Sequence, residues 1–121
     1  MTKAQNSKQY DLEDRTLEFT RRARTFVKKL NRTIANIEDA RQLVKASGSV
    51  GANYIEANEA LSKKDFVMRI KICRKEAKES RYWLRLIDTD GNADLERERK
   101  ELEDEASELT HIFGSIVTKT A

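Results

Sequence analysis

The spacing of its apolar residues limits this chain to helices, because these residues recur every three or four positions along most of the sequence. The 121 residues include no proline and only four glycines, so few positions can break a helix or form a tight turn. Charged residues make up 37% of the chain, against about 25% in an average globular domain. These features together favour long helices with solvated outer faces.

The periodicity predicts four helices joined by short connections. The first two cover residues 12–30 and 36–58, with Asn36 as the expected N-cap of the second. The last begins near Asp94, after a turn that the composition of residues 88–92 indicates. Helices with such short connections pack most economically as an antiparallel up-down-up-down four-helix bundle, so the predicted fold is all-α.

The start of the third helix has the clearest sequence signal. Ser62 and Asp65 have the spacing of a capping box, and Leu61 and Phe66 have the spacing of a hydrophobic staple. Cys73 is the only cysteine, so no intrachain disulfide can form. It falls in the core stripe of this helix, which indicates a small buried hydrophobe and not a nucleophile. That stripe has the alternating spacing of a bundle seam and consists of Phe66, Ile70, Cys73, Ala77, Ser80, Leu84 and Ile87.

The second helix has an apolar arc that spans about half its circumference, which predicts burial on more than one side. It also contains Gly48 and Gly51, although a glycine inside a helix costs up to ~1 kcal/mol relative to alanine. We therefore expect a neighbouring helix to approach closely at these glycines.

Residues 11–121 form a single predicted domain, which follows a polar and flexible N-terminal segment over residues 1–10. No apolar run approaches the ~20 residues that span a bilayer, and no signal-peptide pattern is present. We therefore expect a cytoplasmic protein that does not bind membranes.

The sequence indicates no catalytic residue, metal site or cofactor. Glu108 and His111 match the Glu-x-x-His element of di-iron bundles, but that site needs a second such element, and His111 is the only histidine. His111 also lies opposite the apolar stripe of its helix, so it is expected to face solvent. We predict that the protein is not an enzyme.

Charge is distributed unevenly along the chain. Residues 1–32 have a net charge of +5, residues 59–89 have +4, and residues 90–121 have −5. One face of the third helix has a line of basic residues with a tyrosine among them: Lys64, Lys71, Lys75, Lys78, Tyr82 and Arg85. Arg74 and Arg81 lie on the adjoining flank. This face is either simply solvated or a polyanion-binding surface, with basic groups on phosphates and Tyr82 available for stacking.

A second apolar stripe lies on a flank of the same helix and consists of Met68, Ile72, Trp83 and Leu86. A minimal four-helix bundle covers one stripe per helix, so this flank suggests a self-association interface. The alternative is that Trp83 folds over the edge of the bundle.

Three stretches, over residues 11–19, 49–57 and 65–84, together resemble the four-helix bundle family encoded in intervening sequences of bacterial 23S rRNA genes. The resemblance implies a four-helix protomer and a ring-like homopentamer. It also implies similarity to the accessory variability protein of diversity-generating retroelements, a basic pentameric barrel that works with nucleic acid and a reverse transcriptase. It implies no reaction and no catalytic residue.

The sequence therefore favours a non-enzymatic homo-oligomer that acts as an accessory or scaffold. Its basic surface is expected to bind nucleic acid, with RNA favoured over DNA. The alternative is a protein–protein adaptor that uses the apolar flank or the acidic fourth helix.

Overall fold

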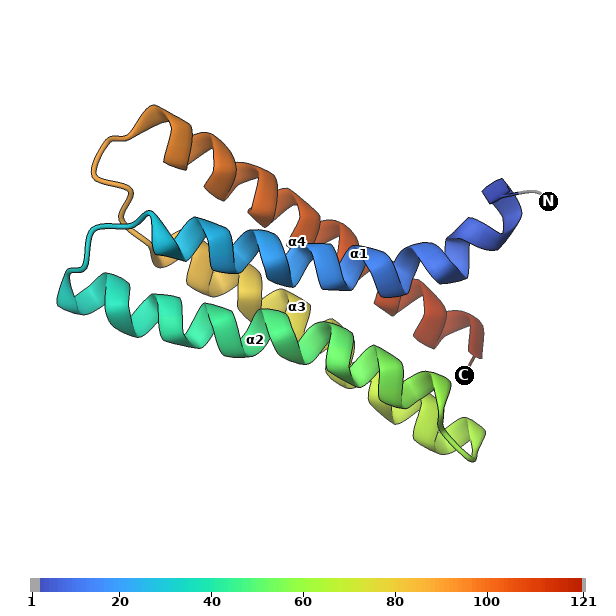
Figure 1. Ribbon diagram of the computed structural model, residues 1–121. Coiled ribbons are helices and arrows are strands. Elements are labelled where there is room, and N and C mark those ends of the chain that lie inside the picture. The colour runs from blue at the N-terminus through green and yellow to red at the C-terminus, as the bar shows by residue number, and fades with distance from the viewer. Residues whose placement is uncertain (1–2, 121) are drawn as a thin grey trace.

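A computed structural model describes the backbone of residues 3–120 and the side chains of residues 12–120. Within these residues the chain forms four helices and no strand: α1 (Lys3–Lys28), α2 (Ile34–Asn58), α3 (Lys63–Leu86) and α4 (Ala93–Thr120). Consecutive helices are antiparallel (Figure 1), with the α2–α3 turn at the same end of the bundle as both termini. The predicted all-α up-down-up-down bundle is confirmed.

Two boundaries show how the sequence pattern relates to the observed helices. α1 begins at Lys3, upstream of the apolar pattern that starts at Leu12. The side chains of residues 1–11 lie outside the described part, so the flexibility of residues 1–10 stays a prediction. The expected turn before α4 is present: Asp90 and Gly91 both have positive φ angles, of 55° and 73°. Such angles suit a short polar residue followed by glycine.

The predicted N-cap role of Asn36 is wrong. Thr33 caps α2, because its Oγ1 accepts a hydrogen bond from the Asn36 amide nitrogen at 3.1 Å. The Asn36 side chain is buried, and its Nδ2 donates to the carbonyl oxygens of Asn31 and Asp88 at 3.1 and 2.9 Å. Its Oδ1 also accepts from the Asp88 backbone nitrogen at 3.0 Å. The side-chain amide of Asn36 thus links the α1–α2 connection to the α3–α4 connection, which lies at the same end of the bundle.

The start of α3 is only partly as predicted. Ser62 is its N-cap, and its Oγ accepts from the Asp65 backbone nitrogen at 3.0 Å. The predicted staple is wrong, because the Leu61 side chain is 97% exposed and so packs against nothing. Phe66 packs against the bundle core without a contribution from Leu61. The core stripe that follows it is confirmed, since Ile70, Leu84 and the other expected positions from Cys73 to Ile87 are buried.

Gly51 lies directly against α1. A Cβ at this position would be 3.0 Å from Thr16 Oγ1 and 3.3 Å from Thr16 Cβ. The predicted close approach is therefore confirmed at Gly51. At Gly48 a Cβ would meet only the end of the Arg24 side chain, at 3.8 Å. The wide burial predicted for α2 is not complete in one chain, because Ile55 remains 51% exposed.

Ion pairs connect α1 to α4. Arg15 holds Glu105 with two bonds, from Nε to Oε2 at 3.0 Å and from Nη2 to Oε1 at 2.7 Å. These hydrogen bonds raise the pKa of Arg15. Two further cations follow Arg15 at intervals of seven residues, Arg22 in α1 and Lys29 directly after it. They form the ion pairs Arg22–Glu101 at 2.7 Å and Lys29–Glu98 at 3.0 Å. The backbones of α1 and α4 approach each other less than those of α2 and α3, so long polar side chains form much of this seam.

Replacing Gly51 by leucine should lower the free energy of unfolding by about 1–3 kcal/mol, because the larger side chain would overpack against Thr16. Gly48→Ala is the matched control in the same helix. It should raise stability by up to ~1 kcal/mol, since the new methyl group has room and helix propensity improves. Urea denaturation checks both values, and a Gly51→Leu variant more stable than wild type would contradict the packing described for α1 and α2.

A double-mutant cycle with Arg15→Ala and Glu105→Ala should give a coupling energy of about 1 kcal/mol at low salt, because the pair is bidentate and partly buried. The coupling should shrink as salt is added. The exposed Arg97–Asp94 pair within α4 is the control and should show almost none. Equal coupling in both cycles would mean that the α1–α4 seam is not special.

Candidate nucleic-acid interface

The basic residues predicted on α3 lie on its solvent-facing side. The helix has nine Lys/Arg and three Asp/Glu, a net charge of +6. Tyr82 is 57% exposed and Arg74 is partly buried. The other predicted residues are all exposed: Lys64, Lys71, Lys75, Lys78, Arg81 and Arg85. The helical phase deduced from the sequence therefore placed these side chains on the correct side of the helix.

The charges of α3 differ from the cations of the α1–α4 seam in how they are paired. The cations of the α1–α4 seam are held by carboxylates of α4. Among the side chains of residues 12–120, none of the ion pairs involves a residue of α3. The basic charge of α3 is thus not neutralised by direct contact, whereas much of the acidic charge of α4 is.

The acidic residues of α4 are also distant from the start of α3. All of them precede Leu109, and residues 109–120 contain no Asp or Glu. Gly114, in this acid-free part, lies beside Arg74, whose Cδ would be 3.7 Å from a Cβ at the glycine. The first half of α3 therefore faces the acid-free end of α4.

Two charged residues of α3, Arg69 and Glu76, lie near α2. Arg69 uses its Nη1 to donate to Asn53 Oδ1 of α2 at 3.0 Å. Glu76 lies near Lys45 of α2, and its pKa is raised, first by burial and then by the neighbouring Glu79. Arg69 and Glu76 are therefore engaged with α2, apart from the outward basic line of α3.

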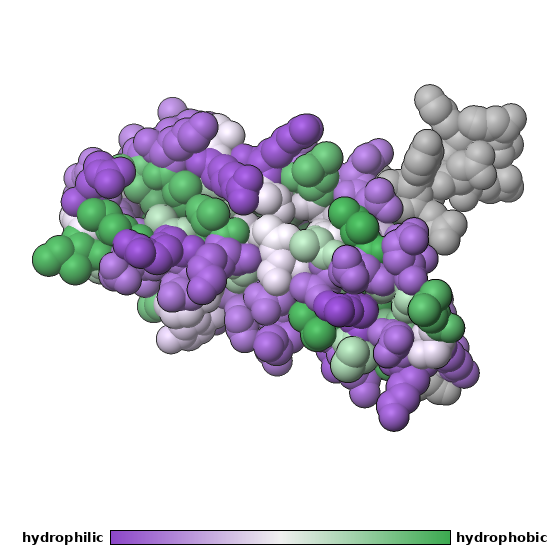
Figure 2. Space-filling view, turned by 60° about the horizontal axis from the view of Figure 1, so that its bottom comes forward, coloured by the Kyte–Doolittle hydropathy of each residue, from purple (hydrophilic) through white to green (hydrophobic). Residues whose placement is uncertain are grey.

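The predicted apolar flank divides into two exposed and two partly buried residues. Met68 and Leu86 are each 49% exposed. Ile72 is partly buried, and Trp83 packs against the bundle core and contacts Tyr82 edge to face, with the ring centroids 5.0 Å apart. Figure 2 shows apolar side chains in separate patches on a largely hydrophilic surface. Trp83 thus contributes to the protomer itself, and Met68 and Leu86 remain available to a partner.

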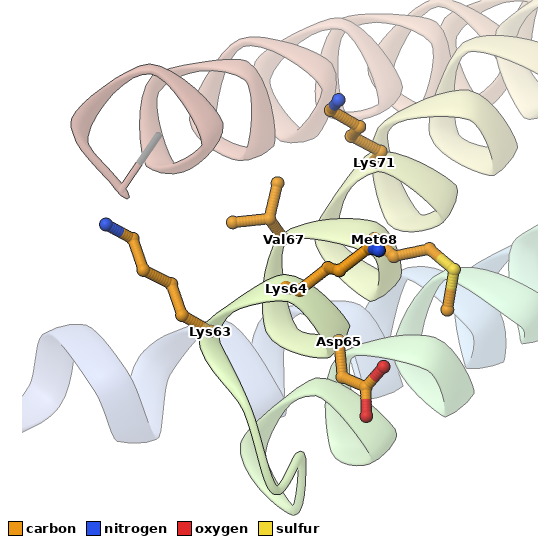
Figure 3. Close-up of a pocket in the computed structure, with 6 residues that line it drawn as sticks. All are labelled: Lys63, Lys64, Asp65, Val67, Met68 and Lys71. Carbon is orange, nitrogen blue, oxygen red and sulfur yellow. The ribbon is translucent and has the colours of Figure 1, made fainter.

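Two residues of this surface were missed by the sequence reasoning. Lys63 and Val67 line an open groove of about 660 Å³ at the start of α3, together with Lys64, Asp65, Met68 and Lys71. In Figure 3, Lys63, Val67 and Lys71 project to the same side of the helix, with Val67 between the two lysines. Their spacing of four residues, which places Lys63, Val67 and Lys71 on one face of a helix, is the signal that could have identified them.

The remaining reactive side chains lie apart from this surface. Cys73 is fully buried, as predicted, and burial raises the pKa of its thiol to about 12. His111 is exposed, as its helical phase predicted. Across the described side chains, no three His, Cys, Asp or Glu residues gather as metal ligands would. None of the described helices is both long and apolar enough to cross a membrane.

Comparison with known proteins agrees with the bundle. A crystal structure at 1.70 Å of a protein of unknown function from the S23 ribosomal protein family of Bacteroides thetaiotaomicron VPI-5482 superposes with a TM-score of 0.72. It is 26% identical, over 87% of this chain and 96% of that one. No curated protein matches the sequence. The family described as 23S rRNA-intervening sequence protein matches residues 8–115. The chain therefore belongs to the 23S rRNA-intervening sequence protein family.

Proposed function

We propose that this protein is a non-enzymatic, homo-oligomeric accessory or scaffold protein that binds nucleic acid, preferentially RNA, through the basic face of α3. The observation that carries the proposal is the density of unpaired cations on α3, which has nine Lys/Arg, whereas on α1 only Arg21, Arg24 and Lys28 are unpaired among the described side chains. The cations of the α1–α4 seam are paired with carboxylates, and the cations of α3 make no such pair among the described side chains. Unpaired cations keep their full attraction for an external polyanion.

The length of the basic face fits a nucleic-acid backbone. Lys71, Lys75, Lys78 and Arg85 extend over about 20 Å on an ideal helix. Successive phosphates of one strand are about 3.4 Å apart along a duplex, so a line of this length meets several of them. The carboxylates of α4 are separated from the first half of α3 by the acid-free residues 109–120, and salt screens their field beyond about 8–10 Å.

Self-association would multiply this affinity. The half-exposed Met68 and Leu86 are apolar surface that a second copy can cover. The number five comes from the family resemblance. In a ring, several α3 faces contact one polymer at once, so modest affinity for each protomer becomes strong binding by avidity.

Charge reversal of Lys71, Lys75 and Lys78 to glutamate should abolish binding to mixed-sequence RNA at about 50 mM salt, where electrostatic binding is strong. The matched control is the triple reversal of Arg21, Arg24 and Lys28 on α1. It makes the same change in net charge on another exposed face and should retain most of the binding.

Fluorescence polarisation with labelled RNA provides the measurement. Equal loss in both triple variants would mean that only overall charge matters, and α3 would not be the site. No binding by the wild-type protein would overturn the nucleic-acid proposal and favour the adaptor function instead.

Light scattering at micromolar concentration should give five times the 14.0 kDa mass of one chain. Replacing both Met68 and Leu86 by serine should shift the protein towards smaller species, because the apolar surface that drives assembly is reduced. Helical circular dichroism should be unchanged, since both side chains are half-exposed. A wild-type protein that scatters as a single chain would contradict the proposed assembly.

A further inference from the structure

The apolar flank of α3 also contains two carboxylates. Glu76 and Glu79 fall between its apolar residues, so that six positions share the three- and four-residue spacing of one helical face: Met68, Ile72, Glu76, Glu79, Trp83 and Leu86. Neither carboxylate forms an ion pair among the described side chains. Burial and the neighbouring Glu79 raise the pKa of Glu76, so its negative charge is incompletely stabilised within one chain. This flank therefore suits a partner that presents both apolar and cationic groups.

The outer face of α2 presents the complementary groups. Four exposed residues at the same helical spacing form this face: Ile34, Ile37, Arg41 and Lys45. Ile34 is 86% exposed, so most of its side chain can still be covered by a partner. Arg41 reaches only Glu38, at 3.8 Å, and both side chains are 63% exposed, so this weak pair leaves the cation available. Two isoleucines followed by two cations thus correspond, in reverse chain order, to Trp83 and Leu86 preceded by two carboxylates.

The levels of these groups along the bundle also agree. α2 and α3 are antiparallel (Figure 1), and the hydrogen bond from Arg69 to Asn53 shows which residues lie level with each other. Rotation about an axis along the helices keeps every residue at its level, so the same correspondence holds between α3 of one copy and α2 of the next. Counting from Arg69 and Asn53 brings three pairs level to within about two residues, or ~3 Å: Leu86 with Ile34, Trp83 with Ile37, and Glu79 with Arg41. Apolar groups therefore meet apolar groups, and carboxylates meet cations, without a shift of one copy along the other.

We propose that the apolar flank of α3 in one copy of the chain packs against the outer face of α2 in the next copy, with Glu79 paired to Arg41 across the contact. The inference rests on the proposed self-association, which it extends from an apolar patch to a defined pair of surfaces. Because the two surfaces differ, the contact is heterologous, and its repetition can close a ring. By helical phase Lys71 and Lys78 lie away from the contact, so the assembled copies keep these cations free for nucleic acid.

Charge reversal tests the proposed pair. Glu79→Lys and Arg41→Glu should each bring like charges together in every contact, so the concentration at which the assembly dissociates should rise about tenfold or more in light scattering. The double variant restores opposite charges and should recover most of the assembly. The matched control combines Glu79→Lys with Arg21→Glu on the exposed face of α1, which gives the same net charge as the double variant. It should remain dissociated, and circular dichroism should show all variants folded.

A pair of introduced cysteines tests the register. Cys73 is fully buried, so thiols placed on the surface react selectively. Leu86→Cys combined with Ile34→Cys should give disulfide-linked dimers and larger species on a denaturing gel after mild oxidation. Leu86→Cys combined with Leu61→Cys is the matched control, because Leu61 is also exposed but lies at the opposite end of the bundle. It should give far fewer linked chains.

The outcomes separate this inference from the proposed function. A wild-type assembly that neither single reversal weakens, or that the double variant fails to restore, would overturn the proposed contact while leaving self-association and nucleic-acid binding in place. Cross-linking by Leu86→Cys alone, in a protein that scatters as two chains, would indicate a two-fold contact of α3 with itself and would also overturn it. A wild-type protein that scatters as one chain would overturn the proposed self-association and this inference with it.

Discussion

The ion pairs between α1 and α4 determine which charges of this protein remain available at its surface. The formal net charge of +3 suggests only a weakly basic molecule. However, Glu98, Glu101 and Glu105 point their carboxylates at cations on or next to α1, so these three acidic groups are paired away from α3. The same pairing leaves fewer free carboxylates on α4 for contact with another protein. Net charge is therefore a poor guide to what this molecule attracts.

The helices and the core were predictable, because both follow from local rules. Apolar periodicity alone identified the buried stripe of α3, including Ile70 and Leu84, and the small size of Gly51 indicated close helix packing. The N-cap of α2 was not predictable in the same way. Thr33 and Asn36 are both good capping residues, and the choice depends on the contact of Asn36 with Asp88, which lies 52 residues further along the chain. The missing staple at Leu61 was not predictable from local sequence either. Leu61 is in solvent because of the path that the α2–α3 connection takes.

The candidate site was predictable in its direction but not in its surroundings. Helical phase placed Lys71, Lys75 and Lys78 outward, and the structure agrees. Pairing between charges of different helices needs the helix order and register, which composition does not contain. The groove likewise involves Lys63 and Val67, two residues that belong to neither the basic line nor the apolar flank that the sequence pattern indicated. Sequence reasoning thus identifies the charged side of a helix more readily than a concave site on it.

The hydrogen bonds of Asn36 have a consequence for the order in which the bundle assembles. They join the start of α2 to the end of α3, so they can form only after these two helices have come together as an antiparallel hairpin. The ion pairs of α1 with α4 span up to 93 residues along the chain. Because α1 also has fewer close backbone approaches to its neighbours than α3 has, we expect the α2–α3 hairpin to form first and α1 to dock last. Its backbone amides should exchange with deuterium in openings that leave the α2–α3 hairpin protected.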